Sequence, residues 1–323
     1  MKTKKTLFGG LFVAIALSAT YAIAQDFPNK PIRIVVPYSP GGGTDAVARI
    51  MAQRLTATLG QSVLVENKPG ASANIGSEFV ARAPADGYTI LVTAPNFTTS
   101  EALYDKLTWR FDDFIPLIHL VRYANVLVAA PDSKMVTLPE MVSRAKAAPG
   151  MMTYGSAGTG SNSHLAMELL KQRVGINPEH VPYKGSGPAL TDLIGGQVQY
   201  CFETMTSATP HVKSGKAIAL AQTRTKRAKG HPNVPTMDEQ GFGGFDATTW
   251  YGLVGPARMN PSFVKRINED MNRVMAMPDV IEKFDQYGAE DGGGSPERFA
   301  EFIRSETQKW AKVIKDAKVQ ADS

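Results

Sequence analysis

A short β-branched run that leads into a glycine-rich turn decides the fold class: Ile32-Arg33-Ile34-Val35-Val36, then Pro37-Tyr38-Ser39-Pro40-Gly41-Gly42-Gly43-Thr44-Asp45. Such a run is typical of a buried strand, and the amphipathic segment over 45–59 predicts a helix after the turn. The same order returns later, where Met152-Thr153-Tyr154 precede Gly155-Ser156-Ala157-Gly158-Thr159-Gly160 and a helix is expected over 162–173. Strands alternating with longer helices predict an α/β fold.

The rest of the chain extends this pattern on both sides of the two units. Further strands are expected at 63–66, 89–92, 127–130, 179–183 and 198–202, and further helices at 74–83, 138–147 and 187–195. After an extended aromatic stretch from Thr248 to Val254, the last third is helical, over 261–275, 278–286 and 296–316. Those helices have no strands of their own to cover, so we expect them to pack back onto the first domain. This predicts two α/β lobes, residues 25–124 plus 250–323 and residues 125–249, joined by crossings near 123–131 and 246–254.

The first 24 residues have the three parts of a secretory signal peptide. Lys2, Lys4 and Lys5 precede an apolar core from Leu7 to Leu17, and Ala22-Ile23-Ala24 supplies a small-x-small cleavage site. We therefore predict a cut after Ala24, with an uncleaved amphiphilic anchor as the alternative. No later run reaches the roughly 18 apolar residues of a membrane span. The mature chain is expected to be exported, to a periplasm or outside the cell.

Charge and composition exclude several classes of protein. The chain of 323 residues is 43% hydrophobic and 20% charged, which is typical of a globular protein. The signal peptide holds three of the 35 basic residues and none of the 30 acidic ones, so the mature net charge is +2. Nucleic acid is therefore not expected as a partner. The single Cys201 cannot form a disulfide framework, and the five histidines show no metal-ligand spacing.

The two glycine-rich turns are the most informative motifs. Glycines let backbone N–H groups converge, and a following helix N-terminus favours negative charge, so one turn in each lobe could hold a small anion between them. The alternative is a plain tight turn with Thr44 or Asp45 as the N-cap. Gly158-x-Gly160-x-x-Ser163 misses the third glycine of a dinucleotide fingerprint, so no nucleotide cofactor is predicted.

A few other residues could border the same cleft. Ser161 and His164 lie three apart at a helix start and could face each other, but no G-x-S-x-G elbow occurs, which favours a structural His164. Glu203 comes one step past the strand over 198–202, where a capping role is as plausible as ligand contact. Tyr38, Phe97 and Thr98 lie beside strand ends, and core packing is the alternative for the aromatic rings.

Several motifs in order carry a resemblance to a known family. They are Pro37 to Asp45 as quoted above, Glu66-Asn67-Lys68-Pro69-Gly70-Ala71, Ala85-Asp86-Gly87-Tyr88-Thr89, Tyr154 to Ser161, and His180-Val181-Pro182-Tyr183-Lys184-Gly185-Ser186. In these motifs the chain, from about residue 26 to residue 316, resembles the solute receptors of tripartite tricarboxylate transporters, also called Bug receptors.

The resemblance implies a periplasmic, two-lobed receptor of the type II (Venus-flytrap) binding-protein fold. It would capture a di- or tricarboxylate or an aromatic carboxylate, without cofactor or catalysis, and deliver it as a monomer to the permease subunits. In the family two loops grip one carboxylate; here these loops are Gly41 to Asp45 and Ser156 to Ser161. Glu203 stands where many relatives carry Asp, and Phe97 is bulkier than the commoner residue.

The expected ligand-contacting residues combine the residue pattern and the resemblance: Tyr38, Gly42, Gly43, Thr44, Asp45, Phe97, Thr98, Ser156, Gly158, Thr159, Ser161, His164, Glu203 and Thr204. A secreted hydrolase or lyase acting on a carboxylic acid, using His164, Ser161 and Glu203, remains the alternative function.

Overall fold

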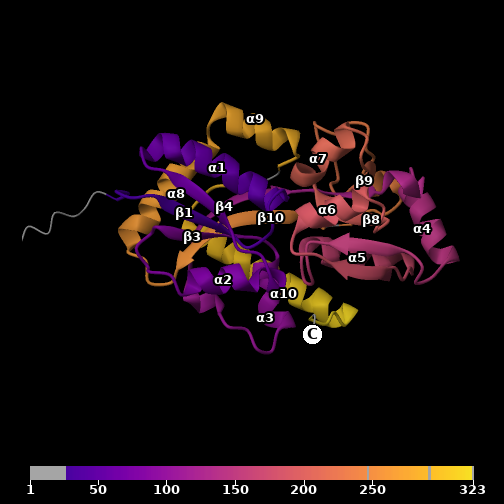
Figure 1. Ribbon diagram of the computed structural model, residues 1–323, viewed down its shortest axis with the longest axis horizontal. Helices are drawn as coiled ribbons and strands as arrows, with labels where there is room; N and C mark the ends of the chain where they lie inside the picture. The colour runs from indigo at the N-terminus through magenta and orange to yellow at the C-terminus, as the bar shows by residue number, and fades with distance from the viewer. Residues whose placement is uncertain (1–26, 246, 290–291, 322–323) are drawn as a thin grey trace, which may run out of the picture.

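The chain folds into two α/β lobes placed side by side along the long axis of the molecule (Figure 1). This computed structural model describes residues 27–245, 247–289 and 292–321; the predicted signal peptide and its cleavage site lie outside the described residues. Each lobe holds one five-stranded sheet, so the predicted α/β class and two-lobed architecture are confirmed.

The sheet of lobe 1 has the strand order β2-β1-β3-β10-β4. Its strands are β1 Ile32–Val36, β2 Val63–Asn67, β3 Thr89–Thr93, β4 Phe114–Tyr123 and β10 Thr249–Pro256. Strand β1 pairs parallel with β2 and β3, whereas β10 pairs antiparallel with β3 and β4. Strand β10 thus comes from the end of the chain and inserts into a sheet built mainly by its beginning.

The sheet of lobe 2 repeats this plan in the order β7-β6-β8-β5-β9. Its strands are β5 Asn125–Ala129, β6 Thr153–Ser156, β7 Glu179–Pro182, β8 Tyr200–Thr204 and β9 Ile218–Gln222. Strand β6 pairs parallel with β7 and β8, and β5 pairs antiparallel with β8 and β9. Strand β8 begins and ends two residues later than predicted, so Glu203 lies inside the strand and not past its end.

Ten α-helices surround the sheets in the described part of the chain. They are α1 Gly43–Leu59, α2 Asn74–Ala81, α3 Asn96–Leu103, α4 Leu138–Ala147, α5 Asn162–Val174, α6 Ser186–Ile194, α7 Met205–Lys213, α8 Pro261–Met275, α9 Pro278–Gln286 and α10 Pro296–Ala317. Short 3-10 turns occur at Ala71–Ala73, Phe111–Asp113, Pro131–Ser133 and Asp238–Gln240. No helix among the described residues has both the length and the apolar character of a membrane span.

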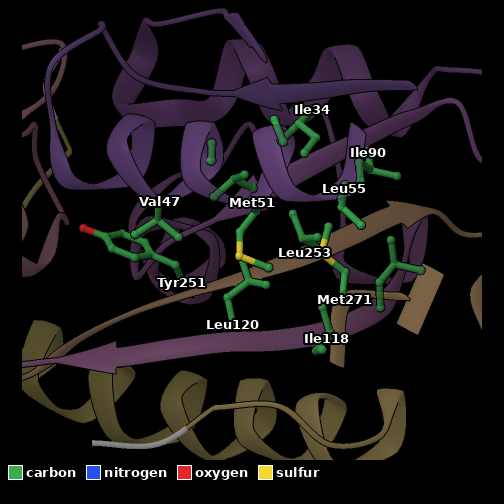
Figure 2. Packing of buried hydrophobic residues seen from close by; sticks show 14 of the residues in the cluster. Ile34, Val47, Met51, Leu55, Ile90, Ile118, Leu120, Tyr251, Leu253 and Met271 are labelled. Atoms are coloured by element: carbon green, nitrogen blue, oxygen red, sulfur yellow. The ribbon is translucent and has the colours of Figure 1, made fainter. Parts of the chain in front are cut away.

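The C-terminal helices pack back onto lobe 1, as predicted. Helix α8 contacts α1 and β4, and α10 contacts α3 and β4. Figure 2 shows the resulting core, in which Met51 and Leu55 of α1 meet Ile118, Leu253 and Met271. Helix α10 also continues along lobe 2, where the fully buried Trp310 packs with Leu165 of α5. The last helix therefore contacts both lobes.

The chain passes between the lobes at two neighbouring places. It leaves the first sheet at Tyr123 and enters the second at Asn125, and it returns to the first sheet at Thr249. A register shift between Tyr251 and Gly252 lies close to the return crossing. The domain boundaries at 124/125 and 249/250 remain predictions, and the changes of sheet fall beside them.

Candidate functional site

A cavity of about 40 Å³ lies between the lobes, with walls from both of them. A cavity of this size holds a few water molecules, so the two walls lie close together. Its lining consists of Tyr38, Gly42, Thr44, Ala94, Pro95, Asn96, Thr249 and Tyr251 from lobe 1, and Asn125, Ala157, Ser161, Asn162, Ser163, Ser186, Phe202, Glu203 and Thr204 from lobe 2.

Five helix N-termini converge on this cavity. The lining includes the first residues or N-caps of helices α1, α3, α5, α6 and α7: Gly42, Asn96, Ser161, Ser186 and Thr204. The first N–H groups of a helix have no intrahelical acceptor, and the helix dipole adds positive potential there. The lining contains no lysine, arginine or histidine. The arrangement is therefore suited to a small anion held largely without basic side chains.

The glycine turn of lobe 1 is held by the side chain of Asp45. The Gly41 N–H donates to Asp45 Oδ2 at 3.1 Å, and the Arg49 guanidinium donates to both carboxylate oxygens at 2.9 Å. Burial works to raise the pKa of Asp45, but the hydrogen bonds from Arg49, Asn67 and Gly41 lower it overall. Because Gly42, the N-cap of α1, has no side chain, the first N–H groups of this helix have no side-chain cap beside the cavity.

The glycine turn of lobe 2 uses its own N–H groups internally. Ala157 donates to Ser163 Oγ at 2.9 Å, Gly158 to Ser156 Oγ at 3.1 Å, and Gly160 to His164 Nδ1 at 3.1 Å. The turn thus shapes the cavity wall through its side-chain bonds. Of its residues, Ala157 and the N-cap Ser161 line the cavity, whereas Ser156, Gly158 and Thr159 lie behind them.

Ser161 and His164 do not pair through their side chains. Ser161 Oγ lies 3.0 Å from Ser163 Oγ and accepts from the His164 backbone N–H. The imidazole accepts from Gly160 through Nδ1, stacks on His180 at 4.0 Å, and lies 3.7 Å from Glu168 through Nε2. Burial, and then Lys171, lowers the pKa of His164 to about 4. The two side chains therefore do not form the pair that was considered, and the imidazole supports the turn, which agrees with the structural role favoured for His164.

Glu203 brings the lining's only carboxyl group to the cavity. Its Oε2 accepts from Ser207 Oγ at 2.9 Å, whereas its buried Oε1 has no hydrogen-bond partner in the described chain. Burial raises the pKa of Glu203 to about 7, although Ser186, Ser207 and the Thr204 N–H act in the opposite direction. Thr204 beside it caps α7, and its hydroxyl lies 2.7 Å from that of Thr206.

Two tyrosines close the lobe 1 side of the cavity. Tyr38 donates its hydroxyl proton to Asn96 Oδ1 at 2.9 Å, and Asn96 donates across the lobes to the Thr159 carbonyl at 3.2 Å. Tyr251 packs its ring into the core of lobe 1, and in Figure 2 its oxygen points away from the other labelled side chains. Burial raises the pKa of both phenols, that of Tyr251 to about 12, so both remain neutral hydrogen-bonding groups.

Phe97 lies in the aromatic core of lobe 1 and not in a loop. It is the second residue of α3 and stacks on Trp109 with ring centroids 5.1 Å apart, while Phe111 and Phe114 meet its edges. Neither Phe97 nor Thr98 belongs to the cavity lining, and the Thr98 hydroxyl donates to the Pro95 carbonyl within its own helix turn.

The structure brings six of the fourteen expected residues to the cavity: Tyr38, Gly42, Thr44, Ser161, Glu203 and Thr204. Gly43, Asp45, Ser156, Gly158, Thr159 and His164 belong to the two glycine turns and the helix starts after them but not to the lining, and Phe97 and Thr98 lie within α3 of lobe 1. Sequence reasoning missed Asn96, Asn125, Ser186 and Tyr251. The Gly185-Ser186 pair before a predicted helix was the available signal for Ser186.

Residues 47–319 of the chain match the protein-family model TctC, the tripartite tricarboxylate transporter family receptor. The chain belongs to this receptor family. Receptors of the family are periplasmic solute-binding proteins. Within the described residues, no cluster of three or more histidine, cysteine, aspartate or glutamate side chains could hold a metal ion.

Several known proteins resemble the chain over nearly its whole length. Protein BugT of Bordetella pertussis is 34% identical over 310 residues, which cover 95% of each chain. The structure of Rpa4515 from R. palustris with adipate has a TM-score of 0.88 at 32% identity, covering 91% of this chain and 99% of that one. MatC of Rhodopseudomonas palustris with bound malate has a TM-score of 0.83 at 31% identity, covering 89% and 100%. The type II binding-protein fold of this TctC receptor is thereby established.

Proposed function

We propose that this TctC receptor binds a small organic acid through a carboxylate in the cavity between the lobes and delivers it to the membrane subunits of a tripartite transporter. The observation that carries the proposal is the convergence of five helix N-termini on a cavity without a basic side chain. An anion in this cavity would accept hydrogen bonds from N–H groups of both lobes and would be stabilised by the helix dipoles of both. Its binding therefore favours the closed arrangement of the lobes. Adipate and malate, bound by two structural neighbours, are dicarboxylates of this kind.

In this proposal the ligand's carboxylate binds at the N-terminus of α1, beside Gly42 and Thr44, opposite the N-terminus of α5 at Ser161. Side-chain hydroxyls and amides around it, such as Thr44 and Asn96, supply further hydrogen bonds or hold bridging waters. Phe202 and Tyr38 provide the apolar surface for the body of the acid. The polar groups of this wall suit a di- or tricarboxylate. The proposal also includes an aromatic carboxylate, because its ring could pack on Phe202 and Tyr38.

Thermal shift with a matched set of compounds tests the proposal. The panel contains adipate, malate, citrate and benzoate, with 1,6-hexanediol as the uncharged counterpart of adipate. A binding acid at a hundred times its dissociation constant should add about 2.7 kcal/mol to the free energy of unfolding, and hexanediol should add nothing. If no acid raises the melting temperature at any pH between 5.5 and 8, the carboxylate function is wrong.

The same samples separate a receptor from an enzyme. NMR spectra taken after prolonged incubation should show the bound acid unchanged, whereas a hydrolase or lyase would consume it. Mass spectrometry of the exported protein should find Gln25 as the first residue, and co-purification with the permease subunits tests the delivery step. Size-exclusion chromatography with light scattering tests the proposed monomer.

A further inference from the structure

Glu203 is an unusual residue for the wall of an anion site. Its side chain is 1% exposed, and it lines the cavity. Oε2 accepts from Ser207, whereas no hydrogen bond of ordinary geometry reaches Oε1 in the described chain; Ser186 and the Thr204 N–H lie near enough to the carboxyl group to oppose the rise of its pKa. No other carboxyl group lines the cavity. A buried polar atom without a partner costs free energy, so a role for Oε1 in the complex has to be sought.

The surroundings of Glu203 contain no cation that would balance a negative charge. Strand β5, in which Val126 pairs with Glu203, carries no charged residue. On α1, Asp45 and Arg49 neutralise each other. On α6, Asp192 accepts from the Tyr183 hydroxyl.

Helix α5 also packs on β8; its Glu168 and Lys171 form an ion pair at 2.7 Å, and burial keeps His164 neutral by lowering its pKa to about 4. Other titratable groups near Glu203 are neutral or lie at a far helix end. Tyr38, Tyr251 and Cys201 are neutral around neutral pH, because burial raises all three of their pKa values. On α7, His211 and Lys213 lie in the last turn, at the end away from the cavity.

An ionised Glu203 would place a second negative charge beside the ligand's carboxylate in a cavity of about 40 Å³. Two carboxylates that share one site do not both ionise readily. A protonated Glu203, in contrast, offers an O–H donor from Oε1 and removes the repulsion. We propose that Glu203 takes part in binding as the neutral acid and donates a hydrogen bond from its carboxyl group to an oxygen of the solute's carboxylate. This inference rests on the proposed function.

The proposal predicts that binding takes up a proton at alkaline pH. The direction follows from linkage: if only the protonated receptor binds the anion, affinity is constant below the pKa of Glu203 and falls tenfold per pH unit above it. With burial holding that pKa at about 7, the dissociation constant for adipate should be about tenfold larger at pH 8 than at pH 6. Both adipate carboxyl groups are largely ionised over this range, so the slope belongs to the protein.

The opposite outcome has an equally clear signature. An ionised Glu203 would instead hold an ammonium group of an amino acid, and affinity would then rise with pH. In that case 2-aminoadipate, which is adipate with one added ammonium group, would bind more tightly than adipate and Glu203→Gln would abolish its binding. The chemistry of the lining favours the neutral acid, because the five helix N-termini repel a cation.

Isothermal titration of the mature protein with adipate at pH 6, 7 and 8, in two buffers of different ionisation enthalpy, decides between these readings. The wild type should take up close to one proton per adipate at pH 8. Glu203→Gln keeps a donor of the same shape, so it should bind adipate at all three pH values without the pH slope and without proton uptake. Glu306→Gln is the matched control, because Glu306 is a buried carboxyl bonded to Trp310 outside the cavity, and it should keep the wild-type slope.

The outcomes separate this inference from the proposed function. Adipate binding with a flat pH profile, or with affinity that rises with pH, overturns the role of Glu203 and leaves the receptor function intact. No binding of any acid in the panel at any pH overturns both. If Glu203→Gln does not fold, the proton uptake of the wild type still decides. Infrared titration of the ligand-free protein adds a direct check, since a carboxylic C=O band that persists above pH 6 is expected.

Discussion

At the scale of single residues, Gly43 shows how closely the lobes approach. A Cβ added there would lie 2.3 Å from Thr204 Oγ1 and 2.4 Å from Thr206 Oγ1, both in lobe 2, and 2.6 Å from the Tyr251 hydroxyl oxygen of lobe 1. We therefore expect Gly43→Ala to hold the lobes apart and to weaken adipate binding at least about tenfold, an effect of roughly 1.4 kcal/mol. Its free energy of unfolding should change by less than about 1 kcal/mol, because alanine suits a helix better than glycine does.

Calorimetry and urea unfolding check this prediction together. Gly195→Ala serves as the control, since Gly195 is exposed and an added Cβ would meet its nearest atom at an ordinary 3.4 Å. Wild-type affinity in Gly43→Ala would mean that the lobes do not approach this closely when ligand is bound.

Phe97, unlike Gly43, packs in the core of lobe 1 and does not line the cavity. Its ring lies within 5.2 Å of three other aromatic rings and is 5% exposed. Phe97→Ala should therefore lower the free energy of unfolding by about 3–5 kcal/mol through the lost contacts and the cavity left behind. In the folded fraction, the affinities for adipate and benzoate should both stay within about threefold of wild type. A stable variant that loses only benzoate binding would show that Phe97 contacts the ligand.

At the scale of elements, the turn between β6 and α5 depends on a neutral histidine. His164 Nδ1 can accept from Gly160 only while it carries no proton. Its pKa of about 4 in the folded chain lies below the usual value of 6.5, so the unfolded chain takes up the proton first as pH falls. The stabilising effect is complete above pH 6.5 and is lost between pH 6.5 and 4, which amounts to about 2 kcal/mol at pH 5.

His164→Asn isolates this contribution, because the asparagine Oδ1 can accept from Gly160 but does not titrate. Urea unfolding at pH 7 and pH 5 should show a loss about 2 kcal/mol smaller in the variant than in the wild type. Asp45 and Glu203 titrate in both proteins and cancel in the difference. Equal losses in the two proteins would show that His164 is not held neutral by burial.

The sequence predicted the first and last residues of some elements correctly, whereas it gave no sign of others. Helices α8 and α9 begin with Pro at 261 and 278, and proline at the first helical position is a strong start signal. Strand β4 was missed because Pro116 interrupts its apolar pattern, and its pairing with β10 has two register shifts. Helix α3 was missed because its Thr and Ser residues look like a loop, while their hydroxyls bond to carbonyls of the same helix turn.

The site was predictable as a place but only partly as a set of residues. The glycine turns marked helix N-termini, and the residues next to α1, Gly42 and Thr44, do reach the cavity. A turn N–H can bind a ligand only if no side chain of the protein accepts from it. The side chains of Ser156 and His164 do accept from two of these groups, and the sequence around the turn does not reveal this. Tyr251 reaches the site only because β10 inserts beside β3, a pairing between distant parts of the chain.

At the scale of the whole molecule, the lobes are joined by more than the two crossings. Among the described residues, three hydrogen bonds from lobe 1 reach backbone carbonyls of lobe 2: the Ser39 N–H to the Lys184 carbonyl at 2.9 Å, Asn96 to the Thr159 carbonyl at 3.2 Å, and Thr99 to the Gly160 carbonyl at 2.9 Å. In the other direction, Lys229 of lobe 2 donates to Asp285 of lobe 1 at 2.5 Å. Two of the three lobe 2 acceptors belong to the glycine turn that His164 supports. Closure and the shape of that turn are therefore linked, and the ligand needs to supply only part of the closing free energy.

This linkage gives a prediction for Thr99, which lies outside the cavity lining. Thr99→Val keeps the side-chain volume but removes the hydrogen bond to Gly160 across the cleft, which at 2.9 Å is shorter than the hydroxyl's 3.3 Å bond to the Asn96 carbonyl in its own helix. The closed state should lose about 0.5–1.5 kcal/mol. Adipate should bind roughly two- to tenfold more weakly. The loss should appear mainly as faster dissociation, because the open form that the ligand first meets is unchanged.

Stopped-flow kinetics and small-angle scattering test the prediction on the same variants. Scattering of the wild type should show a smaller radius of gyration with adipate than without it, and Thr99→Val should need a higher adipate concentration to reach the same decrease. Thr58→Val is the control, because the Thr58 hydroxyl donates to the Arg54 carbonyl inside α1 and touches no lobe 2 residue through that bond. A radius of gyration that stays constant at saturating adipate would contradict closure, since a ligand that prefers neither arrangement cannot shift the balance between them.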